Sequence, residues 1–339
     1  MNKISLQEWL KLSDQTKHNI FEEISKIIGL PPAAVEKDWW VVRTLEIIFN
    51  SSIANHTVFK GGTSLSKAWG LIDRFSEDID LALDRKFLGF EKADSEMTSS
   101  QVSKLRRLSS SFIAEKYFPE ISEKFIESGL DVKIQLGEIK ADDQDPLVIE
   151  IYYPSVTDPI GYLQPRILIE IGSRSLMEPF STKSFVSMVG EHYAGRAFAD
   201  LHISVPTVNP ERTFLEKIFL LHETFQIPNE RTKIERKSRH LYDLEKLMDT
   251  DFAIEALNNK ELYQTIVEHR RKLTTIRGID YANHTPDKIN PIPPDEIIGE
   301  WEKDYIAMQQ SMLYNPSLQF DKLIARIKTL KDKINEIKH

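Results

Sequence analysis

The fold is decided by residues 59–83, FKGGTSLSKAWGLIDRFSEDIDLAL, where two strand-like segments flank a pair of glycines and a short helix. Gly61 and Gly62 have no side chains, so the backbone there can approach a ligand closely or take a positive φ. Thr63 and Ser64 are of the residue types that cap helices, and we expect the short helix to start at them. A helix N-terminus offers free N–H groups and a positive dipole, so this turn is predicted to hold a phosphate.

Two carboxylates follow on the second strand-like segment. Asp78 and Asp80 are two residues apart and would point to one face of a strand, while Ile79, Leu81 and Leu83 would point to the other. Neighbouring carboxylates repel each other unless a cation lies between them, and Mg²⁺ is a hard ion that prefers oxygen ligands. A phosphate-binding turn beside a metal-binding carboxylate pair is typical of phosphoryl or nucleotidyl transfer.

The pattern GGTSLS (61–66) followed by RFSEDIDL (74–81) resembles the nucleotidyltransferase AbiEii/MenT toxin family of the polymerase-β-like nucleotidyltransferase superfamily. Taken singly, Gly-Gly usually marks a turn and Asp-x-Asp a solvated strand end, but their order and helix-length spacing favour the family. No G-x-x-x-x-G-K-[ST] pattern follows the glycines, which excludes a P-loop. The resemblance implies an α/β (α+β) fold, with a polymerase-β-like core built on a mixed sheet and an α-helical C-terminal domain after it.

Two later segments also resemble signatures of this family. PERTFLEK ends at Lys217, and the resemblance implies that this lysine contacts the triphosphate of the nucleotide. RHLYDL contains Asp243, which would support catalysis or orient Lys217 from a neighbouring helix. Read without the family, Lys217 would be a surface lysine paired with Glu216 or Glu223.

A third metal-binding carboxylate is implied by the superfamily, which commonly takes one from a later strand. Glu170 in RILIEIGS is the first candidate, on a strand expected over 166–171 whose isoleucines form the opposite face. Glu150 in LVIEIYY is the second candidate. The alternative for either is a carboxylate at the edge of the sheet that faces solvent.

The chain is predicted to divide near VPTVNP, into a nucleotidyltransferase core with N-terminal helices over 1–205 and a helical domain over 206–339 that completes the active-site cleft. Helices are expected over 6–29, 33–49 and 101–129, the last with an interruption at Pro119, and strands over 130–136, 146–153 and 166–171. From Pro210 onward the pattern is helical.

Composition narrows the class of protein. The sequence has no cysteine and no apolar run long enough to cross a membrane, and its N-terminus does not read as a signal peptide, so a cytoplasmic protein is expected. A net charge of −8 argues against broad non-specific binding to nucleic acid. The dense basic run RTKIERKSRH (231–240) is most simply a solvated helix face, but next to the Asp243 signature it could receive an RNA backbone.

By resemblance, the protein would transfer a nucleoside monophosphate from a nucleoside triphosphate to an RNA 3′ end, with a tRNA as the expected acceptor and Mg²⁺ or Mn²⁺ as cofactor. Gly61 to Ser64 and Lys217 would hold the triphosphate, and Asp78, Asp80 and Glu170 would hold the metal. Its role would be that of a toxin in a toxin–antitoxin or phage-defence pair, with a separately encoded antitoxin. Two other classes stay open: nucleotidylation of a protein or small molecule, and a non-catalytic nucleotide-binding module.

Overall fold

The computed structural model describes residues 3–75, 78–158, 163–228 and 234–338, and the chain divides into two compact units. The core unit comprises Met1–Ala68, Phe75–Glu91 and Ser100–Thr207; the helical unit comprises Trp69–Arg74, Lys92–Ser99 and Val208–His339. The main division therefore falls two residues after the predicted one. The two short segments from the first hundred residues that join the helical unit were not predicted.

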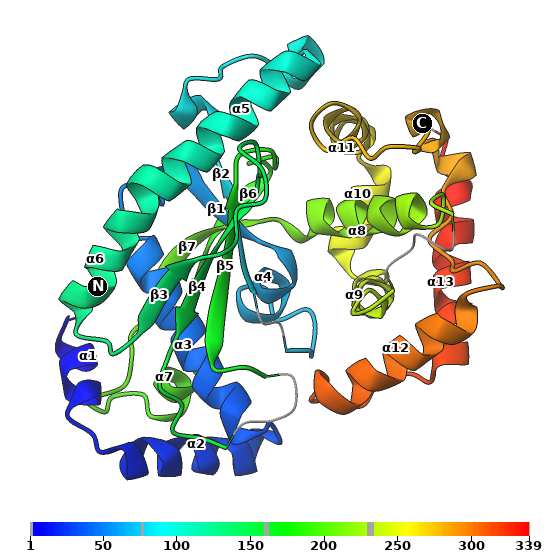
Figure 1. The fold of residues 1–339 in the computed structure, drawn as a ribbon. Coiled ribbons are helices and arrows are strands. Elements are labelled where there is room, and N and C mark those ends of the chain that lie inside the picture. The colour runs from blue at the N-terminus through cyan, green and yellow to red at the C-terminus, as the bar shows by residue number, and fades with distance from the viewer. Residues whose placement is uncertain (1–2, 76–77, 159–162, 229–233, 339) are drawn as a thin grey trace. The chain divides into compact units, whose positions relative to one another are not determined.

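The core unit is built on a mixed sheet of seven strands in the order β3-β4-β5-β2-β1-β7-β6 (Figure 1). Strand β2 lies between β5, to which it is parallel, and β1, to which it is antiparallel. Strands β3, β4 and β5 pair antiparallel in turn, and β1 is parallel to β7. The strands are β1 (Thr57–Lys60), β2 (Asp78–Leu83), β3 (Lys133–Leu136), β4 (Leu147–Tyr152), β5 (Arg166–Gly172), β6 (Phe180–Phe185) and β7 (Ile203–Val208). The predicted fold class, an α/β core with a mixed sheet, is confirmed.

The central strands separate an apolar face from a polar one. On β5, Ile167, Ile169 and Ile171 are fully buried, whereas Leu168 and Glu170 are half-buried, so the predicted alternation is confirmed. Helix α3 packs against this strand. Each buried isoleucine contributes about 1.5–3 kcal/mol to stability, and a one-residue slip would turn all three to the polar face. Burial of one face thereby fixes which residues the other face presents.

Helices of the core unit lie on both sides of the sheet, with α5 and α6 along one side and α4 on the other (Figure 1). They are α1 (Lys3–Leu10), α2 (Asp14–Ile28), α3 (Pro32–Ile48), α4 (Gly61–Lys67), α5 (Ser99–Phe112), α6 (Phe118–Ser128) and α7 (Met188–His192). A π-helical segment, Ile113–Tyr117, joins α5 to α6 where an interruption was expected at Pro119. Pro119 itself is the second residue of α6, which directly follows the π-helical segment, as expected where a proline interrupts the hydrogen-bond ladder of a continuous helix.

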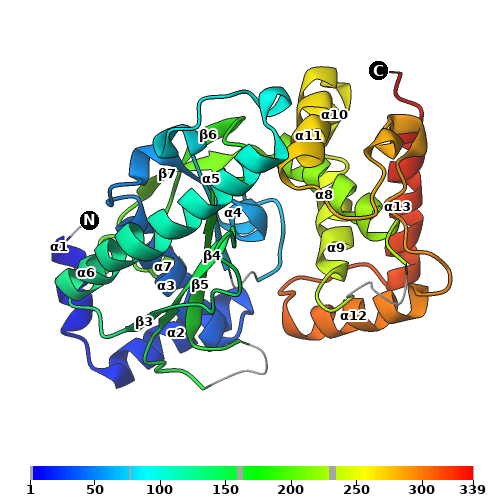
Figure 2. The same ribbon diagram turned by 45° about the horizontal axis from the view of Figure 1, so that its top comes forward.

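The helical unit consists mainly of α-helices, seen from a second direction in Figure 2. They are α8 (Pro210–Thr224), α9 (Ser238–Leu247), α10 (Asp251–Asn258), α11 (Lys260–Leu273), α12 (Ile298–Ser311) and α13 (Phe320–Asn335). Helix α8 begins at Pro210, as predicted, and buries Phe214, Ile218 and Leu221 on its apolar face. Across the described residues, no helix has both the length and the apolar character needed to span a membrane.

Candidate active site

The glycine turn connects β1 directly to α4. The helix begins at Gly61, so the predicted start at Thr63 and Ser64 is wrong, and the N-cap is Lys60 without a side-chain cap bond. Gly61 has φ of +82°, a conformation that L side chains rarely adopt. A Cβ atom on Gly61 would overlap the carboxylate of Asp80 and lie 2.8 Å from its Cγ. Glycine is therefore required here both by the backbone angle and by the approach of Asp80.

The two hydroxyls after the glycines fasten the turn to the strand that follows. The Thr63 hydroxyl donates to the Asp78 carbonyl oxygen at 2.5 Å, and the Ser64 hydroxyl donates to the Gly61 carbonyl oxygen at 2.9 Å. Both residues are buried. Since the first N–H groups of a helix have no intrahelical acceptor, the backbone of Gly61, Gly62 and Thr63 is the part of this turn suited to an anion.

The register of the sheet places the carboxylates together on its polar face. Asp80 pairs with Lys60 on β1 and with Glu170 on β5, and Asp78 pairs with Leu168. Strand β5 is internal to the sheet, so the reading of Glu170 as a sheet-edge carboxylate is wrong. No three acidic or histidine side chains in the described ranges are grouped so that they alone could hold a metal ion. Asp78 and Asp80 still fit a divalent cation of the Mg²⁺ type, which usually takes one or two carboxylates together with substrate phosphates and water.

Glu150, the second candidate for the third ligand, belongs to a cross-strand network. Its carboxylate accepts a hydrogen bond from the Tyr152 hydroxyl and another from Gln135 Nε2 at 2.9 Å, and Arg166 lies 3.8 Å away. The Tyr152 hydroxyl is the main cause that lowers the pKa of Glu150. In register Glu150 faces Leu168. Of the two candidates, Glu170 is the one beside Asp80.

The helical unit brings Lys217 and Asp243 together. Lys217 on α8 and Asp243 on α9 are both buried, and Lys217 Nζ lies 2.8 Å from Asp243 Oδ2. The alternative of a surface lysine paired with Glu216 or Glu223 is wrong, because Glu216 pairs with Arg212 and Glu223 lies in a separate network. The roles assigned to the two residues stay predictions.

Arg74 completes this cluster and was not singled out from the sequence. Its Nε donates to Asp243 Oδ1 at 2.6 Å and its NH2 donates to Asp243 Oδ2 at 2.8 Å, so the guanidinium binds the carboxylate in a bidentate manner. The only signal in the sequence was its position, as the first residue of the RFSEDIDL motif. We call Arg74, Lys217, His240 and Asp243 the buried cation cluster.

Burial and charge set the ionisation of the cluster. Burial alone would raise the pKa of Asp243, but Arg74 and Lys217 outweigh it and hold that pKa well below its usual range. Burial lowers the pKa of Lys217, and the charge of Asp243 opposes the shift. His240 Nδ1 lies 3.5 Å from Lys217 Nζ, and burial followed by the Lys217 charge lowers the pKa of His240, which keeps its imidazole neutral. Asp243 is thus a permanent anion between two cationic groups.

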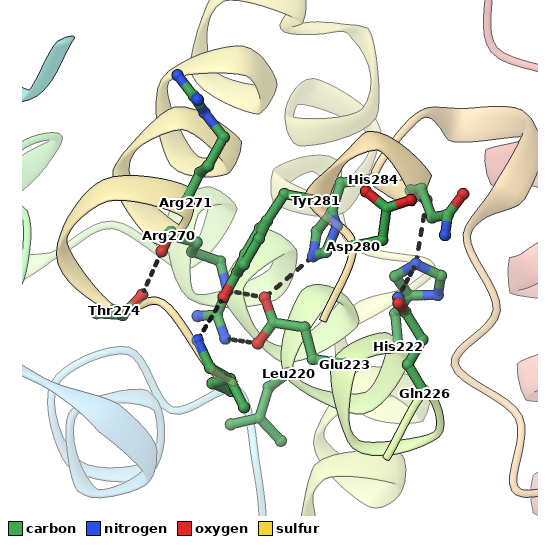
Figure 3. A network of polar contacts seen from close by, with 12 residues as sticks. Leu220, His222, Glu223, Gln226, Arg270, Arg271, Thr274, Asp280, Tyr281 and His284 are labelled. Atoms are coloured by element: carbon green, nitrogen blue, oxygen red, sulfur yellow. Dashed lines mark hydrogen bonds and ion pairs between the residues drawn. The ribbon is translucent and has the colours of Figure 1, made fainter. Parts of the chain in front are cut away.

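Glu223 anchors a different polar network, drawn in Figure 3. Arg270 Nε donates to Glu223 Oε1 at 2.7 Å, and the His284 imidazole lies 3.0 Å from the same oxygen. On the preceding residue of α8, His222 Nδ1 accepts a hydrogen bond from the Asn290 N–H at 3.1 Å. This network links α8 to α11 and to the segment after it, and its side chains are engaged with one another, as expected of a structural element.

Comparison with known proteins decides the family. A family profile described as "Nucleotidyl transferase AbiEii toxin, Type IV TA system" matches residues 43–326, which contain the glycine turn, both β2 carboxylates, Lys217 and Asp243. The chain belongs to the AbiEii family. It is therefore a nucleotidyltransferase, of a family of toxins from type IV toxin–antitoxin systems.

A solved structure supports the AbiEii fold. The chain is similar to MenT4, a nucleotidyltransferase toxin from Mycobacterium tuberculosis H37Rv, with a TM-score of 0.50 and 15% sequence identity. The match covers 96% of this chain and 91% of MenT4. No curated protein matches the chain. At this identity the likeness to MenT4 concerns the fold alone.

Proposed function

We propose that this AbiEii-family enzyme transfers a nucleoside monophosphate from a nucleoside triphosphate to the 3′ end of an RNA, with a tRNA as the expected acceptor. The reaction depends on Mg²⁺ or Mn²⁺ and takes place in the cytoplasm. The protein acts as the toxin of a toxin–antitoxin or phage-defence pair and is restrained by a separately encoded antitoxin. The observation that carries the proposal is the contact of Asp80 with Gly61, since it puts a metal-binding carboxylate against a phosphate-binding turn.

Each group of residues has a defined task in this reaction. The N–H groups of Gly61, Gly62 and Thr63, with Ser64 behind them, orient the β- and γ-phosphates. Asp78 and Asp80, with Glu170 beside them, hold the cation. When bound, the divalent ion offsets the negative charge that develops on the transferred phosphoryl group.

The chemical step is an in-line displacement at the α-phosphorus. The 3′-hydroxyl oxygen of the acceptor forms a bond to phosphorus and gives its proton to solvent water, and the bond to pyrophosphate breaks on the opposite side. We propose that Lys217 neutralises the triphosphate, and that Asp243 holds the Lys217 ammonium in place and favours its charged form against the effect of burial.

The test is transfer of label by the purified protein. Wild-type protein would be incubated with Mg²⁺, each labelled nucleoside triphosphate in turn, total cellular RNA and cell protein. We expect label in a small RNA band, lost on addition of EDTA and restored by excess Mg²⁺. The Asp78→Ala/Asp80→Ala variant should give no label, while Asp142→Ala, which removes a carboxylate whose side chain is 78% exposed, should label like the wild type.

The outcomes separate the function classes. Label on a protein band would overturn the RNA acceptor in favour of side-chain modification. Label on neither RNA nor protein, with nucleotide binding intact, would overturn the transfer proposal itself. Label in RNA that survives Asp78→Ala/Asp80→Ala would overturn the metal-binding role of the pair.

A further inference from the structure

A row of basic and aromatic side chains continues the polar face of the sheet beyond Glu170. Lys133 on β3 pairs with Tyr152 on β4, and Tyr152 pairs with Arg166 on β5, so the three side chains lie side by side across three strands. They are on the same face as Asp78, because Leu168 pairs with Asp78 and is two residues from Arg166. We call these three residues the basic row.

The basic row is ordered and accessible within the core unit. Arg166 NH1 lies 3.4 Å from the Tyr152 hydroxyl, and Gln135 Nε2 lies 3.3 Å from the same oxygen. The Arg166 side chain is 36% exposed, Lys133 is exposed and Tyr152 is half-buried. These bonds, and the contacts of both side chains with the Glu150 carboxylate, restrict the rotamers of Arg166 and Tyr152 before any ligand arrives, which lowers the entropic cost of binding.

The order of the strands sets the direction from which an acceptor arrives. The phosphate-binding turn follows β1, on one side of β2, while β5, β4 and β3 lie on the other side. In an in-line displacement the attacking and leaving oxygens are on opposite sides of the phosphorus. If pyrophosphate leaves toward the turn, the attacking hydroxyl comes from the side of β5. This step rests on the proposed function, because it takes the turn as the site of the β- and γ-phosphates.

We propose that the basic row is the acceptor subsite, which binds the last nucleotides of a single-stranded RNA 3′ end. Strands lie about 4.8 Å apart and residues about 3.3 Å apart along a strand, so the row extends from roughly 8 Å to roughly 16 Å from Asp78. That distance suits the nucleotides just behind the reacting ribose. Lys133 and Arg166 bind backbone phosphates, and Tyr152 between them offers a ring for a base. In a protein with a net charge of −8, Lys133 and Arg166 supply local positive charge that attracts an RNA backbone.

The test compares two double variants that remove the same charge from the core unit. Lys133→Gln/Arg166→Gln alters the row; Arg107→Gln/Lys140→Gln alters two side chains elsewhere that are 54% and 76% exposed. Measurements are KM and kcat for the labelled RNA, affinity for the nucleoside triphosphate, and RNA binding as a function of salt. For the row variant we expect KM for RNA to rise at least tenfold, with nucleotide affinity and kcat at saturating RNA unchanged. The salt slope should fall by about 0.7 for each lost phosphate contact.

A second pair of variants tests the ring of Tyr152. Tyr152→Phe keeps the ring and removes the hydroxyl, whereas Tyr152→Leu removes the ring. We expect Tyr152→Phe to bind RNA nearly as the wild type does and Tyr152→Leu to bind several-fold more weakly. Thermal unfolding of each variant identifies any loss of folding, and Tyr152→Phe, which keeps the packing volume, keeps the test informative if Tyr152→Leu is unstable.

The failure of this inference differs from the failure of the proposed function. Wild-type transfer to RNA together with an unchanged KM in the row variant overturns the acceptor subsite and leaves the proposed function standing. An equal loss of nucleotide affinity and RNA affinity also overturns it, since the row would then serve the nucleotide. A wild-type enzyme that labels protein and no RNA overturns the proposed function, and the acceptor subsite with it.

Discussion

At the scale of single residues, Gly61 meets two separate demands. Its φ of +82° belongs to the left-handed region, and the Asp80 carboxylate occupies the space that a side chain would need. Gly89 has nearly the same angle, φ of +81°, but a Cβ atom there would meet nothing within 4 Å. A comparison of substitutions at Gly61 and Gly89 therefore distinguishes the effect of backbone strain from the effect of the contact with Asp80.

We expect Gly61→Ala and Gly89→Ala both to lose about 1–2 kcal/mol of stability from the left-handed backbone. Only Gly61→Ala should lose transfer activity, by about 10²-fold, because displacement of a catalytic carboxylate by an ångström costs that much. Urea unfolding and the RNA-labelling assay measure the two effects. Equal activity in the two variants would mean that the contact of Gly61 with Asp80 has no part in the reaction.

Candidate site residues that lie within short motifs could be found from the sequence. Contacts between residues far apart in the sequence could not. Asp78 and Asp80 share a face because side chains alternate along a strand with a period of two, and this rule can be applied to the sequence alone. The pairing of Arg74 with Asp243 joins positions 169 residues apart, and no local periodicity records it. Glu170 was found because its strand alternates, but its position beside Asp80 required the register.

At the scale of elements, the buried cation cluster joins α8 and α9 to the segment that follows α4. Asp243 is fully buried between Lys217 and Arg74, and Arg74 is 2% exposed. A buried carboxylate that loses one of its cations keeps the cost of desolvation without the compensating attraction. The cluster is therefore a place where a single substitution affects both helices.

We expect Arg74→Gln to destabilise the protein by about 3–5 kcal/mol. Arg326→Gln is the matched control, since Arg326 pairs with Glu245 and Asp249 at a side chain that is 36% exposed, and it should cost less than about 1 kcal/mol. Adding Asp243→Asn to Arg74→Gln should recover no activity and should cost less stability than the sum of the two single variants, because the Arg74–Asp243 pair can be lost only once. Urea unfolding of Arg74→Gln, Asp243→Asn and the double variant gives the coupling energy between the two residues. A coupling energy near zero would mean that the Arg74–Asp243 pair does not stabilise the protein.

Elements with strong periodicity were predicted well, and irregular ones were not. Helices α3 and α8 follow from their apolar pattern and the prolines at their starts. Strand β6 (FSTKSF) was missed because its four central residues are polar and only its last residue, Phe185, is buried. The start of α4 was misplaced because the tight turn lets glycine, usually a poor helix residue, begin the helix.

At the scale of the whole molecule, the buried histidine His222 contributes to how stability depends on pH. Burial, and then the neighbouring His284, lowers the pKa of His222 to about 4. His222 Nδ1 accepts from the Asn290 N–H, so Nε2 carries the proton and faces the Asn283 carbonyl oxygen at 3.1 Å. A second proton on Nδ1 would break the bond to Asn290.

The contribution of His222 to the free energy of unfolding should therefore be constant well above pH 6.5 and should fall between pH 6.5 and 4, by up to about 3 kcal/mol. His240, whose pKa burial also lowers, contributes in the same direction. In that range the unfolded chain, with an ordinary histidine pKa, binds a proton that the folded protein does not. His222→Gln should make this part of the profile less steep, while His202→Gln, at an exposed histidine, should leave it unchanged. Urea unfolding at several pH values measures the slope, and an unchanged slope in His222→Gln would assign it to another group.

The composition of the helical unit limits which gene segments recombination could exchange between such enzymes. Two of its three pieces, Trp69–Arg74 and Lys92–Ser99, come from within the sequence of the core unit, and they supply Arg74 to Asp243 and Asp94 to His269. A gene segment that encodes residues 208–339 alone would leave both pairs incomplete. Residues 208–339 are thus not a self-contained cassette that recombination can exchange between nucleotidyltransferases, because they need matching residues on either side of strand β2.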